Sequence, residues 1–284
     1  MRFESPDTIE QAVELLNTCD GISRVLAGGT DVLVQLRLAL VEPELIVDLK
    51  HIAGMRDITA EAGGFRIGAA VSGAEMGEHE GLVALWPGVV EAMELVGSTQ
   101  VQGRATLVGN LCNGSPAADS VPAMVAANAL VAITGPNGTR ECPVADIVTG
   151  PGKTSLSKGE VITSVFLPAR PDNSGDAYLR FIPRTEMDIA VSSAGVNLTL
   201  EGGVVSAATV ILGAVAPTVV SVDTSMLIGT KLDDAALAAL QAACAAACNP
   251  IDDKRGTIEF RTKTAGVMAK RAALIAFSRA GGSK

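Results

Sequence analysis

Ala105-Thr-Leu-Val-Gly-Asn-Leu-Cys-Asn-Gly-Ser-Pro-Ala-Ala-Asp119 is the stretch of this sequence that decides its fold. It combines the turn-forming residues Gly109, Asn110 and Gly114 with hydroxyl and amide side chains, and it ends in a carboxylate. No hydrophobic period runs through it, so core packing is not its purpose. Such a segment exposes backbone N–H groups that can surround an anion, and an acid such as Asp119 can accept hydrogen bonds from sugar hydroxyls.

A second segment with the same chemistry is Leu26-Ala-Gly-Gly-Thr-Asp31. It lies between a predicted strand, 24–27, and a predicted helix, 32–40. This opening places both glycines and Thr30 at a helix N-terminus, where free N–H groups and the helix dipole favour phosphate. Two phosphate-type turns in one chain predict a bound nucleotide cofactor.

Composition limits the partners of the chain. Its 284 residues, 48% of them hydrophobic, can bury a large core and predict two or three units. The formal net charge of -9 disfavours nucleic acid and anionic membranes as partners, because no basic stripe is available to displace counterions. A bound diphosphate would therefore be neutralised mainly by backbone dipoles.

The N-terminus and the cysteines predict a cytoplasmic protein. The first six residues resemble neither a signal peptide nor a lipidation site, and no apolar run approaches the roughly 20 residues of a membrane span. Five scattered cysteines are typical of a reducing compartment. With only two histidines, the chain offers no credible ligand set for a metal or an iron–sulfur centre. A redox centre of this chain is thus expected to be organic.

The elements before residue 170 are expected to form two units. Asp7 and Glu10 predict a capping box for the first helix, and a buried strand is predicted over 45–49. A second unit is expected to begin at about residue 55, with another capping box at Ser72 and Glu75. Its short strands, separated by turn residues, predict an antiparallel α+β unit. Its other predicted elements are a strand over 65–69, an amphipathic helix over 82–96, and strands over 129–133 and 160–167.

The rest of the chain is expected to be a separate unit. Residues 168–175, rich in Pro, Asp, Asn and Gly, are the predicted linker. Residues 190–201 alternate in polarity, and Gly202-Gly203 predicts a tight hairpin turn into a strand over 204–215. Helices are predicted over 234–247 and 263–280. The predicted units are 1–54, 55–170 and 176–284.

Each short motif is weak alone. A Gly-Gly pair between a strand and a helix is more often only a turn, and Gly28-Gly29-Thr30-Asp31 lacks the third glycine and the later acid of the dinucleotide-binding fingerprint. Gly150-Pro-Gly-Lys-Thr154 resembles the end of a P-loop, but Ile147 stands in place of the first glycine, so we reject a nucleoside-triphosphate site. Ser115 has no histidine in a suitable context, which disfavours a serine hydrolase.

Taken in order, however, these segments resemble one family: the FAD-binding medium subunits of molybdenum hydroxylases, the group of xanthine dehydrogenase and carbon monoxide dehydrogenase. The segments span nearly the whole chain at the family's spacing. Several matches in the same order are strong evidence for the resemblance, although each single match is weak evidence. The residues that carry the resemblance are Ala27-Gly-Gly-Thr-Asp31, Thr106-Leu-Val-Gly-Asn110, Ser115-Pro-Ala-Ala-Asp119, Gly150-Pro-Gly-Lys-Thr154, Glu160-Val-Ile162, Arg180, Asp188-Ile-Ala190 and Asp252-Asp-Lys-Arg-Gly256.

The resemblance implies the fold and the cofactor. The fold class is α+β, with two FAD-binding subdomains of the vanillyl-alcohol-oxidase (PCMH) type followed by a C-terminal domain of a three-stranded antiparallel sheet with helices. Main-chain N–H groups of the two turns are expected to hold the diphosphate of FAD, and Asp119 its polar hydroxyl region. Ile162 is expected near the adenine or its ribose, and Arg180 near the flavin, where the family often has a lysine. The implied FAD-binding residues are Val25, Leu26, Ala27, Gly28, Gly29, Thr30, Asp31, Val32, Val96, Thr106, Val108, Gly109, Asn110, Ser115, Asp119, Ile162 and Arg180.

The sequence departs from the family pattern at two positions. The second turn of the family usually reads Thr-x-Gly-Gly-Asn, and Val108 replaces its first glycine. A β-branched residue is strained at positive φ, so we expect Val108 to be extended and Gly109 to carry the sharp turn. Val96 stands where some relatives pack an aromatic ring on the flavin, so contact there is expected to be aliphatic. The cysteine spacing excludes the iron–sulfur loop that a related branch inserts.

The resemblance also implies an electron-transfer function. The chain is expected to carry FAD in a heteromeric hydroxylase, with the molybdenum cofactor on a large partner subunit and two [2Fe–2S] clusters on a small one. Electrons would pass from these clusters to FAD and then to an external acceptor, and no residue of this chain would be catalytic toward the organic substrate. The implied assembly is a dimer of heterotrimers. The substrate and the acceptor (NAD, a quinone, a cytochrome or oxygen) stay open.

Two other functions stay open at this point. A self-sufficient FAD-linked oxidase would need its own substrate pocket and commonly links the flavin to a His or Cys. A single tyrosine, Tyr178, and two histidines outside the turns disfavour it. A cofactor-free assembly subunit that kept the fold is the second alternative, and Val108 is the feature that favours it.

Overall fold

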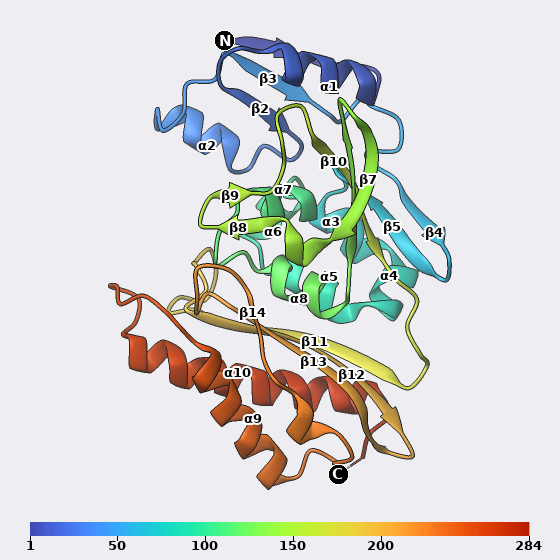
Figure 1. Ribbon diagram of the computed structural model, residues 1–284, viewed down its shortest axis with the longest axis vertical. Helices are drawn as coiled ribbons and strands as arrows, with labels where there is room; N and C mark the ends of the chain where they lie inside the picture. Colours follow the sequence, from blue (N-terminus) through green and yellow to red (C-terminus); the bar gives the residue numbers. More distant parts are fainter. Residues whose placement is uncertain (284) are drawn as a thin grey trace.

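The computed structural model describes residues 1–283, and its elements form three parts along the long axis of the molecule (Figure 1). The N-terminal part, blue in Figure 1, is a parallel sheet in the order β1-β3-β2. Every residue of its central strand is buried. The elements of this part are β1 (Arg2–Glu4), α1 (Ile9–Thr18), β2 (Ser23–Leu26), α2 (Val32–Arg37) and β3 (Leu45–Asp48).

The two helices of the N-terminal part begin and end differently from the predictions. The cap of α1 is Thr8, whose hydroxyl accepts a hydrogen bond from the Gln11 N–H (3.3 Å), so the predicted capping box at Asp7 and Glu10 is wrong. Thr8 has the extended backbone that a cap residue needs, at φ −132° and ψ 157°. Helix α2 ends before residue 40, because Ala39 adopts a left-handed φ of 52°.

The central part is a sheet in the order β4-β5-β10-β6-β7, and its strand pairs are antiparallel, as the turn pattern predicts. Short helices and a small hairpin surround it (Figure 1). The strands of the sheet are β4 (Ile58–Glu61), β5 (Gly64–Gly68), β6 (Leu130–Gly135), β7 (Gly138–Pro143) and β10 (Val161–Leu167). The other elements are α3 (Gly73–Glu78), α4 (Glu80–Leu85), α5 (Pro87–Glu94), α6 (Thr99–Gln102), α7 (Leu107–Cys112), α8 (Ser120–Ala126), the 3₁₀ turn η1 (Val144–Asp146), and the hairpin of β8 (Val148–Gly150) and β9 (Lys153–Thr154).

Local sequence explains the helices of the central part. The capping box predicted at Ser72 and Glu75 is confirmed, because the Glu75 N–H donates to Ser72 Oγ (3.3 Å) and the Ser72 N–H donates to Glu75 Oε2 (2.8 Å). The single helix predicted over 82–96 is wrong, because the chain forms α4 and α5 with Trp86 between them. Pro87 has no N–H with which to continue α4, but it suits the first position of α5.

The C-terminal part is an antiparallel sheet in the order β11-β12-β13-β14, so the prediction of a three-stranded sheet is wrong. Strand β14 pairs only with Ile211 and Leu212 and is too short to show an alternating pattern. The predicted Gly202-Gly203 turn is present, with φ of 60° and 80°. The elements are β11 (Ser174–Phe181), β12 (Ser192–Glu201), β13 (Val204–Gly213), β14 (Val220–Ser221), η2 (Ser225–Leu227), α9 (Asp234–Ala247) and α10 (Ile258–Arg279).

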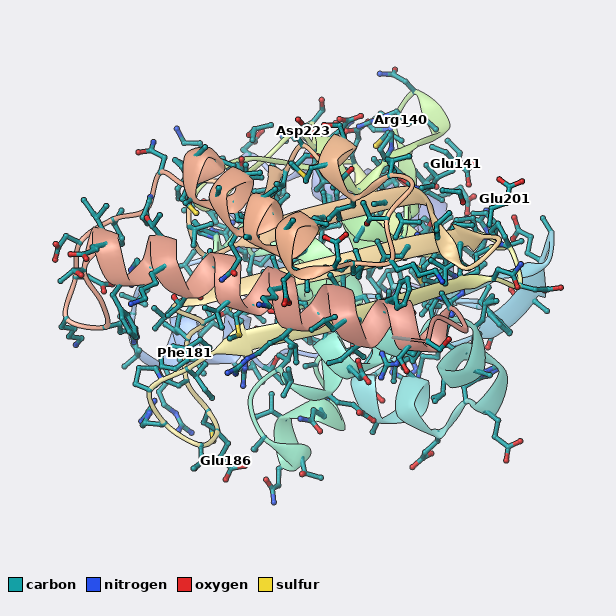
Figure 2. The ribbon with its side chains drawn as sticks, turned by 90° about the horizontal axis from the view of Figure 1, so that it is seen from below. Arg140, Glu141, Phe181, Glu186, Glu201 and Asp223 are labelled. Carbon is teal, nitrogen blue, oxygen red and sulfur yellow. The ribbon has the colours of Figure 1, made fainter. Side chains whose placement is uncertain are left out.

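The C-terminal sheet separates two hydrophobic cores. Helices α9 and α10 lie on one of its faces, as Figure 2 shows, and α5 and α8 pack on the other. Neighbouring residues of β11 point to opposite faces. Ala177 therefore joins the core beneath α10, whereas Tyr178 joins the core of the central part. That second core runs without a break into the N-terminal part, so residues 1–54 and 55–170 share one interior.

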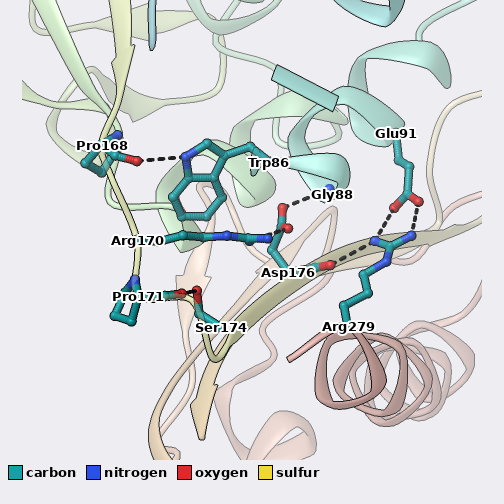
Figure 3. A network of polar contacts seen from close by, with 9 residues as sticks. All are labelled: Trp86, Gly88, Glu91, Pro168, Arg170, Pro171, Ser174, Asp176 and Arg279. Carbon is teal, nitrogen blue, oxygen red and sulfur yellow. Dashed lines mark hydrogen bonds and ion pairs between the residues drawn. The ribbon is translucent and has the colours of Figure 1, made fainter. Parts of the chain in front are cut away.

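A buried polar network joins the C-terminal sheet to the central part (Figure 3). Asp176 of β11 accepts a hydrogen bond from the Gly88 N–H of α5 (2.8 Å) and pairs with Arg170 (2.7 Å). Position 88 requires glycine, since a Cβ there would lie 2.5 Å from Asp176 Oδ2. Arg279 of α10 pairs with Glu91 of α5 and donates to the Asp176 carbonyl (2.8 Å). These contacts fix β11 against the helices of the central part.

Candidate functional site

The first of the two turns that the sequence singles out contacts the residues directly before the second. Gly28, in the turn between β2 and α2, lies against the main chain of Arg104 and Ala105, just before α7. A Cβ at position 28 would stand 1.9 Å from the Arg104 carbonyl oxygen and 3.2 Å from the Ala105 Cα. Glycine is therefore required there by close approach of two backbones. The fold brings together two segments that are far apart in the sequence.

The first turn, residues 28–32, offers a set of free main-chain donors. Within residues 1–283, none of its five N–H groups donates a hydrogen bond. Gly29 has a φ of 79°, the left-handed region that glycine adopts without strain. Thr30 and Asp31 are exposed, and the other residues of the turn are half-buried. Because α2 is only six residues long, the donors themselves matter more than a helix dipole.

The second turn uses two of its N–H groups internally. Thr106 caps α7, and its hydroxyl accepts a hydrogen bond from the Gly109 N–H (2.9 Å). The Asn110 N–H donates to the Thr106 carbonyl (3.0 Å). Of the residues predicted here, Gly109 and Asn110 thus have no free main-chain donor. The second turn forms a capped helix against the first turn rather than a matching set of free amides.

The predicted backbone of the second turn is wrong. Val108 lies inside α7 and is helical rather than extended, and Gly109 is helical rather than the site of a sharp turn. A helix that begins at Leu107 needs no positive φ at the next residue, so a β-branched side chain is tolerated. Gly114, after α7, has the positive φ, 59°. Its Cα lies against the β8–β9 hairpin, whose Gly152 N–H donates to the Gly114 carbonyl (2.9 Å).

Two predicted polar side chains shape the loop between α7 and α8. Asn110 Oδ1 accepts hydrogen bonds from the N–H (3.3 Å) and the hydroxyl (2.7 Å) of Ser120. Ser115 Oγ accepts one from the Ala117 N–H (3.2 Å). Both side chains therefore hold the loop in place, and the loop in turn fixes the position of Asp119.

Asp119 is buried and meets two donors from β11. Tyr178 donates its hydroxyl to Asp119 Oδ1 (2.7 Å), and Arg180 Nη1 donates to Oδ2 (2.6 Å). Burial raises the pKa of the Asp119 carboxyl, and the Arg180 guanidinium opposes that rise. Burial and the neighbouring carboxylate raise the pKa of the Tyr178 phenol, so it stays a donor at neutral pH. Within residues 1–283, the buried Arg180 Nε has no hydrogen-bond partner.

Tyr178 is not among the site residues predicted from the sequence. The sequence signal for it is the period of two along β11, which puts the tyrosine on the same face as Arg180. The Arg104 carbonyl is not among them either, because the pattern of side chains does not predict a contact between two main chains.

The remaining predicted residues lie at different depths. Val25, on the edge strand β2, is exposed, and Val96 is half-buried beside the central core. Ile162, on β10, has a side chain 2% exposed that packs within the central core. The side chain of Ile162 therefore does not face an open site.

Other kinds of site find little support. His79 caps α4, its Nδ1 accepting from the Leu82 N–H (3.0 Å), so it has a structural role. Across residues 1–283, no group of three or more His, Cys, Asp or Glu is placed to hold a metal ion. In the same part of the chain, no helix combines the length and the apolar character that crossing a membrane requires. Hollows of about 500 and 270 Å³ lie elsewhere, one beside Leu36 and Pro43, the other beside Arg140 and Lys158.

Two families match the chain in succession. The family described as the FAD binding domain in molybdopterin dehydrogenase matches residues 1–170. The family described as the CO dehydrogenase flavoprotein C-terminal domain matches residues 177–276. The first match contains both turns, and the second contains Tyr178 and Arg180.

Relatives and solved structures agree with these families. The carbon monoxide dehydrogenase medium chain of Afipia carboxidovorans is 34% identical over 280 residues, which cover 98% of this chain and 97% of the relative. The xanthine dehydrogenase FAD-binding subunit of Escherichia coli O157:H7 is 33% identical over 74% of this chain and 73% of its own. A chain of the Cu,Mo-CO dehydrogenase in its cyanide-inactivated form has a TM-score of 0.94 and 33% identity, with 98% of both chains covered.

Proposed function

Because the chain belongs to the family of FAD-binding subunits of molybdopterin dehydrogenases, we propose that its two neighbouring turns hold the diphosphate of FAD. The relatives are medium or FAD-binding subunits of carbon monoxide dehydrogenase and xanthine dehydrogenase. This chain is accordingly an FAD subunit of a heteromeric molybdenum hydroxylase, an oxidoreductase. The single observation that carries the proposed site is the contact of Gly28 with the Arg104 main chain beside five free N–H groups.

The residues of the first turn fit a dinucleotide diphosphate. An acidic chain has few cations to offer, and free amides on a turn with a left-handed glycine form an anion-binding concavity without any lysine. Residues 28–32 supply free donors, and the N–H groups of Leu107 and Val108 at the start of α7 likewise donate no hydrogen bond within residues 1–283. Val108 does not obstruct this arrangement, because it is 7% exposed and packs inward from the helix. The feature that favoured a cofactor-free assembly subunit is thereby removed.

The chain binds, orients and shields the cofactor, and none of its residues acts on the organic substrate. Bound FAD supplies a centre that accepts electrons singly and releases them singly or in pairs. Residues 25–32 are proposed to bind through the main chain. Residues 106–110 shape the neighbouring wall, and Asp119 and Arg180 lie at the end of the loop that follows. Val96 would contribute only aliphatic contact, and Ile162 only its main chain.

The partners belong to the proposal as well. A large subunit with the molybdenum cofactor, a small subunit with two [2Fe–2S] clusters and an external electron acceptor are the partners that the resemblance implies. The names of the relatives, which call them medium chains or subunits, support partners of both larger and smaller size. A dimer of such heterotrimers in the cytoplasm completes the proposed assembly, and five free cysteines are consistent with a reducing compartment.

A self-sufficient FAD-linked oxidase is the less favoured alternative. Such an enzyme needs an accessible phenolic or basic side chain, and Tyr178 is 2% exposed with its hydroxyl bound to Asp119. His79 is committed to capping α4. The geometry therefore favours a subunit that depends on partners for its electrons.

Titration of the purified full-length chain with FAD tests the proposal. We expect quenching of flavin fluorescence at one equivalent and a yellow chain after gel filtration. FMN, which lacks the diphosphate bridge and the adenosine, is the matched control and should bind at least about tenfold more weakly. The loaded chain should oxidise no purine, aldehyde or N-heterocycle until partner subunits are added. Equal affinity for FMN and FAD, or a chain that stays colourless with FAD, would overturn the proposed site.

A further inference from the structure

One face of β11 carries three polar residues toward the central part of the molecule. Asp176, Tyr178 and Arg180 occupy alternate positions of the strand and therefore share this face. Asp176 is held by the Gly88 N–H and by Arg170, as Figure 3 shows. Tyr178 and Arg180 instead meet Asp119. The strand is thus fixed at its start by one polar contact and toward its end by another.

The Asp119 carboxylate has both oxygens bound by this strand. The Tyr178 hydroxyl donates to Oδ1 (2.7 Å) and Arg180 Nη1 donates to Oδ2 (2.6 Å). The side chains of Arg180 and Asp119 are only 5% and 9% exposed. A buried carboxylate with two such donors has one orientation, and so has the guanidinium bound to it.

The fixed guanidinium keeps one donor unused. Arg180 Nε is buried and has no hydrogen-bond partner within residues 1–283. Buried donors are almost always satisfied, because leaving one without a partner is unfavourable. A side chain buried to nine-tenths with an unpaired donor points to a ligand that supplies the acceptor.

Asp119 is also connected to the second turn. Asn110, inside α7, binds the Ser120 N–H and hydroxyl, and Ser120 directly follows Asp119. The Ala214 N–H, at the end of β13, donates to the Pro116 carbonyl of the same loop (2.8 Å). The loop between α7 and α8 is therefore held from both sides, and the Asp119–Arg180 pair is linked through it to the second turn.

We propose that Tyr178 is a positioning residue for the cofactor: by holding Asp119, it fixes Arg180 so that Nε donates to an acceptor atom of bound FAD. This inference rests on the proposed function. Tyr178 itself touches no cofactor atom and acts only through Asp119 and Arg180. A guanidinium fixed beside the cofactor also favours its electron-rich form, because a positive charge stabilises added negative charge.

The variants Tyr178→Phe and Asp119→Asn test this role in the full-length chain. Tyr178→Phe keeps the aromatic packing and removes only the hydroxyl. We expect its FAD dissociation constant to rise about tenfold, as for the loss of a hydrogen bond that orients a charge, and the flavin midpoint potential to become more negative. Asp119→Asn keeps the shape and should also raise the FAD dissociation constant, but it removes a negative charge beside Arg180, so its midpoint potential should not become more negative. The readouts are fluorescence titration with FAD and spectroelectrochemical titration of the loaded chain.

The matched control is Asp176→Asn. Asp176 is a buried aspartate on the same face of the same strand, but it binds α5 and not the loop beside the turns. Its variant should lower the melting temperature while leaving the FAD dissociation constant within twofold and the midpoint potential unchanged. If Asp176→Asn changed the potential as much as Tyr178→Phe does, the effect would be a general loosening of the sheet and the inference would be wrong.

A double-mutant cycle with Arg180→Gln separates action through Arg180 from direct contact. If Tyr178 acts through Arg180, adding Tyr178→Phe to Arg180→Gln changes the affinity no further. Independent, additive losses would overturn the positioning role. A wild-type chain that binds no FAD would instead refute the proposed function. Normal FAD binding by all of these variants, with an unchanged potential, would refute this inference alone.

Discussion

The first turn, residues 28–32, and the second turn, residues 106–110, have similar sequences and different structures. Both contain glycine and threonine, but the first turn leads into a short helix, whereas the second forms the cap and first residues of one. The N–H groups of the first turn are free, whereas Thr106 binds the N–H groups of Gly109 and Asn110 to cap α7. The side chain of Thr106 therefore removes donors that the first turn keeps. In the proposed site, the first turn is the main part that binds the diphosphate, and the second turn supports it.

The glycines of the two turns also have different requirements. Gly28 is required because another backbone occupies the place of its side chain, and Gly29 because of its φ. Gly109 is helical, and a Cβ there would meet only Thr106 Oγ1, at 2.9 Å. Replacement of glycine by alanine should therefore reduce FAD affinity far more in the first turn than in the second.

The largest effect is expected for Gly28→Ala. A Cβ 1.9 Å from the Arg104 carbonyl must push the two turns apart, and overpacking of this kind commonly costs about 1–3 kcal/mol. The affinity for FAD, measured by fluorescence titration, should fall about 10- to 100-fold. Gly150→Ala is the control, since a Cβ at position 150 meets nothing within 4 Å. Equal affinities for the two alanine variants would show that the turns need not touch.

Removal of the cap that distinguishes the second turn should have a smaller effect. Thr106→Val keeps the shape of the side chain but leaves the Gly109 N–H without its acceptor, which should lower the free energy of unfolding by about 1 kcal/mol. FAD affinity should fall less than in Gly28→Ala, because the loss of the cap leaves the contact between Gly28 and the Arg104 main chain in place. Thr8→Val removes the equivalent cap of α1 and should lower stability with no change in affinity. Chemical denaturation and FAD titration of both variants make the comparison.

Asp31 ends the first segment and Asp119 the second, and the two aspartates differ in burial. The pH dependence of the free energy of unfolding can reveal this difference. Asp31 is exposed, whereas burial raises the pKa of Asp119 above 3.8. Such a group contributes stability that is fully present below its unfolded-state pKa and is lost as pH rises through the folded-state value. The free energy of unfolding of Asp119→Asn should therefore decline less than that of the wild type between about pH 4 and pH 7, by at most about 1.4 kcal/mol per pH unit.

An aspartate with the opposite shift is the control for this pH experiment. The N–H and the hydroxyl of Ser225 lower the pKa of Asp223, so its contribution is present above pH 3.8 and is lost as pH falls through the folded-state value. Asp223→Asn should make the chain less sensitive to acid. Denaturation curves measured across the pH range would contradict the assignment if both variants changed the pH dependence in the same direction.

The same contrast shows how much of the molecule the sequence could predict. Hydrophobic periods located most strands and helices, and turn residues located both turns, because these signals are local. The prediction of one helix over 82–96 missed the break at Pro87, although proline rarely continues a helix and the signal is local. The cap of α7 could not be predicted, because the sequence around Thr106 is the same whether its hydroxyl faces a ligand or accepts from the Gly109 N–H. The alternation along β11 places Tyr178 on the face of Arg180, but the contact of Tyr178 with Asp119 and that of Gly28 with the Arg104 carbonyl join distant segments, which no local pattern encodes.

Restoring the family glycine should have the smallest effect on cofactor binding. Val108 is helical and 7% exposed, so Val108→Gly removes packed methyl groups and adds backbone freedom that costs about 0.5–1 kcal/mol in a helix. The variant should therefore be less stable than the wild type, while its FAD dissociation constant should stay within about twofold, a change of less than 0.5 kcal/mol. Val90→Gly, at a buried valine of α5 away from the turns, is the control for the stability loss alone. A clear gain in affinity for Val108→Gly, absent in Val90→Gly, would mean that the second turn also binds through its main chain and that the two turns are more alike than their hydrogen bonds indicate.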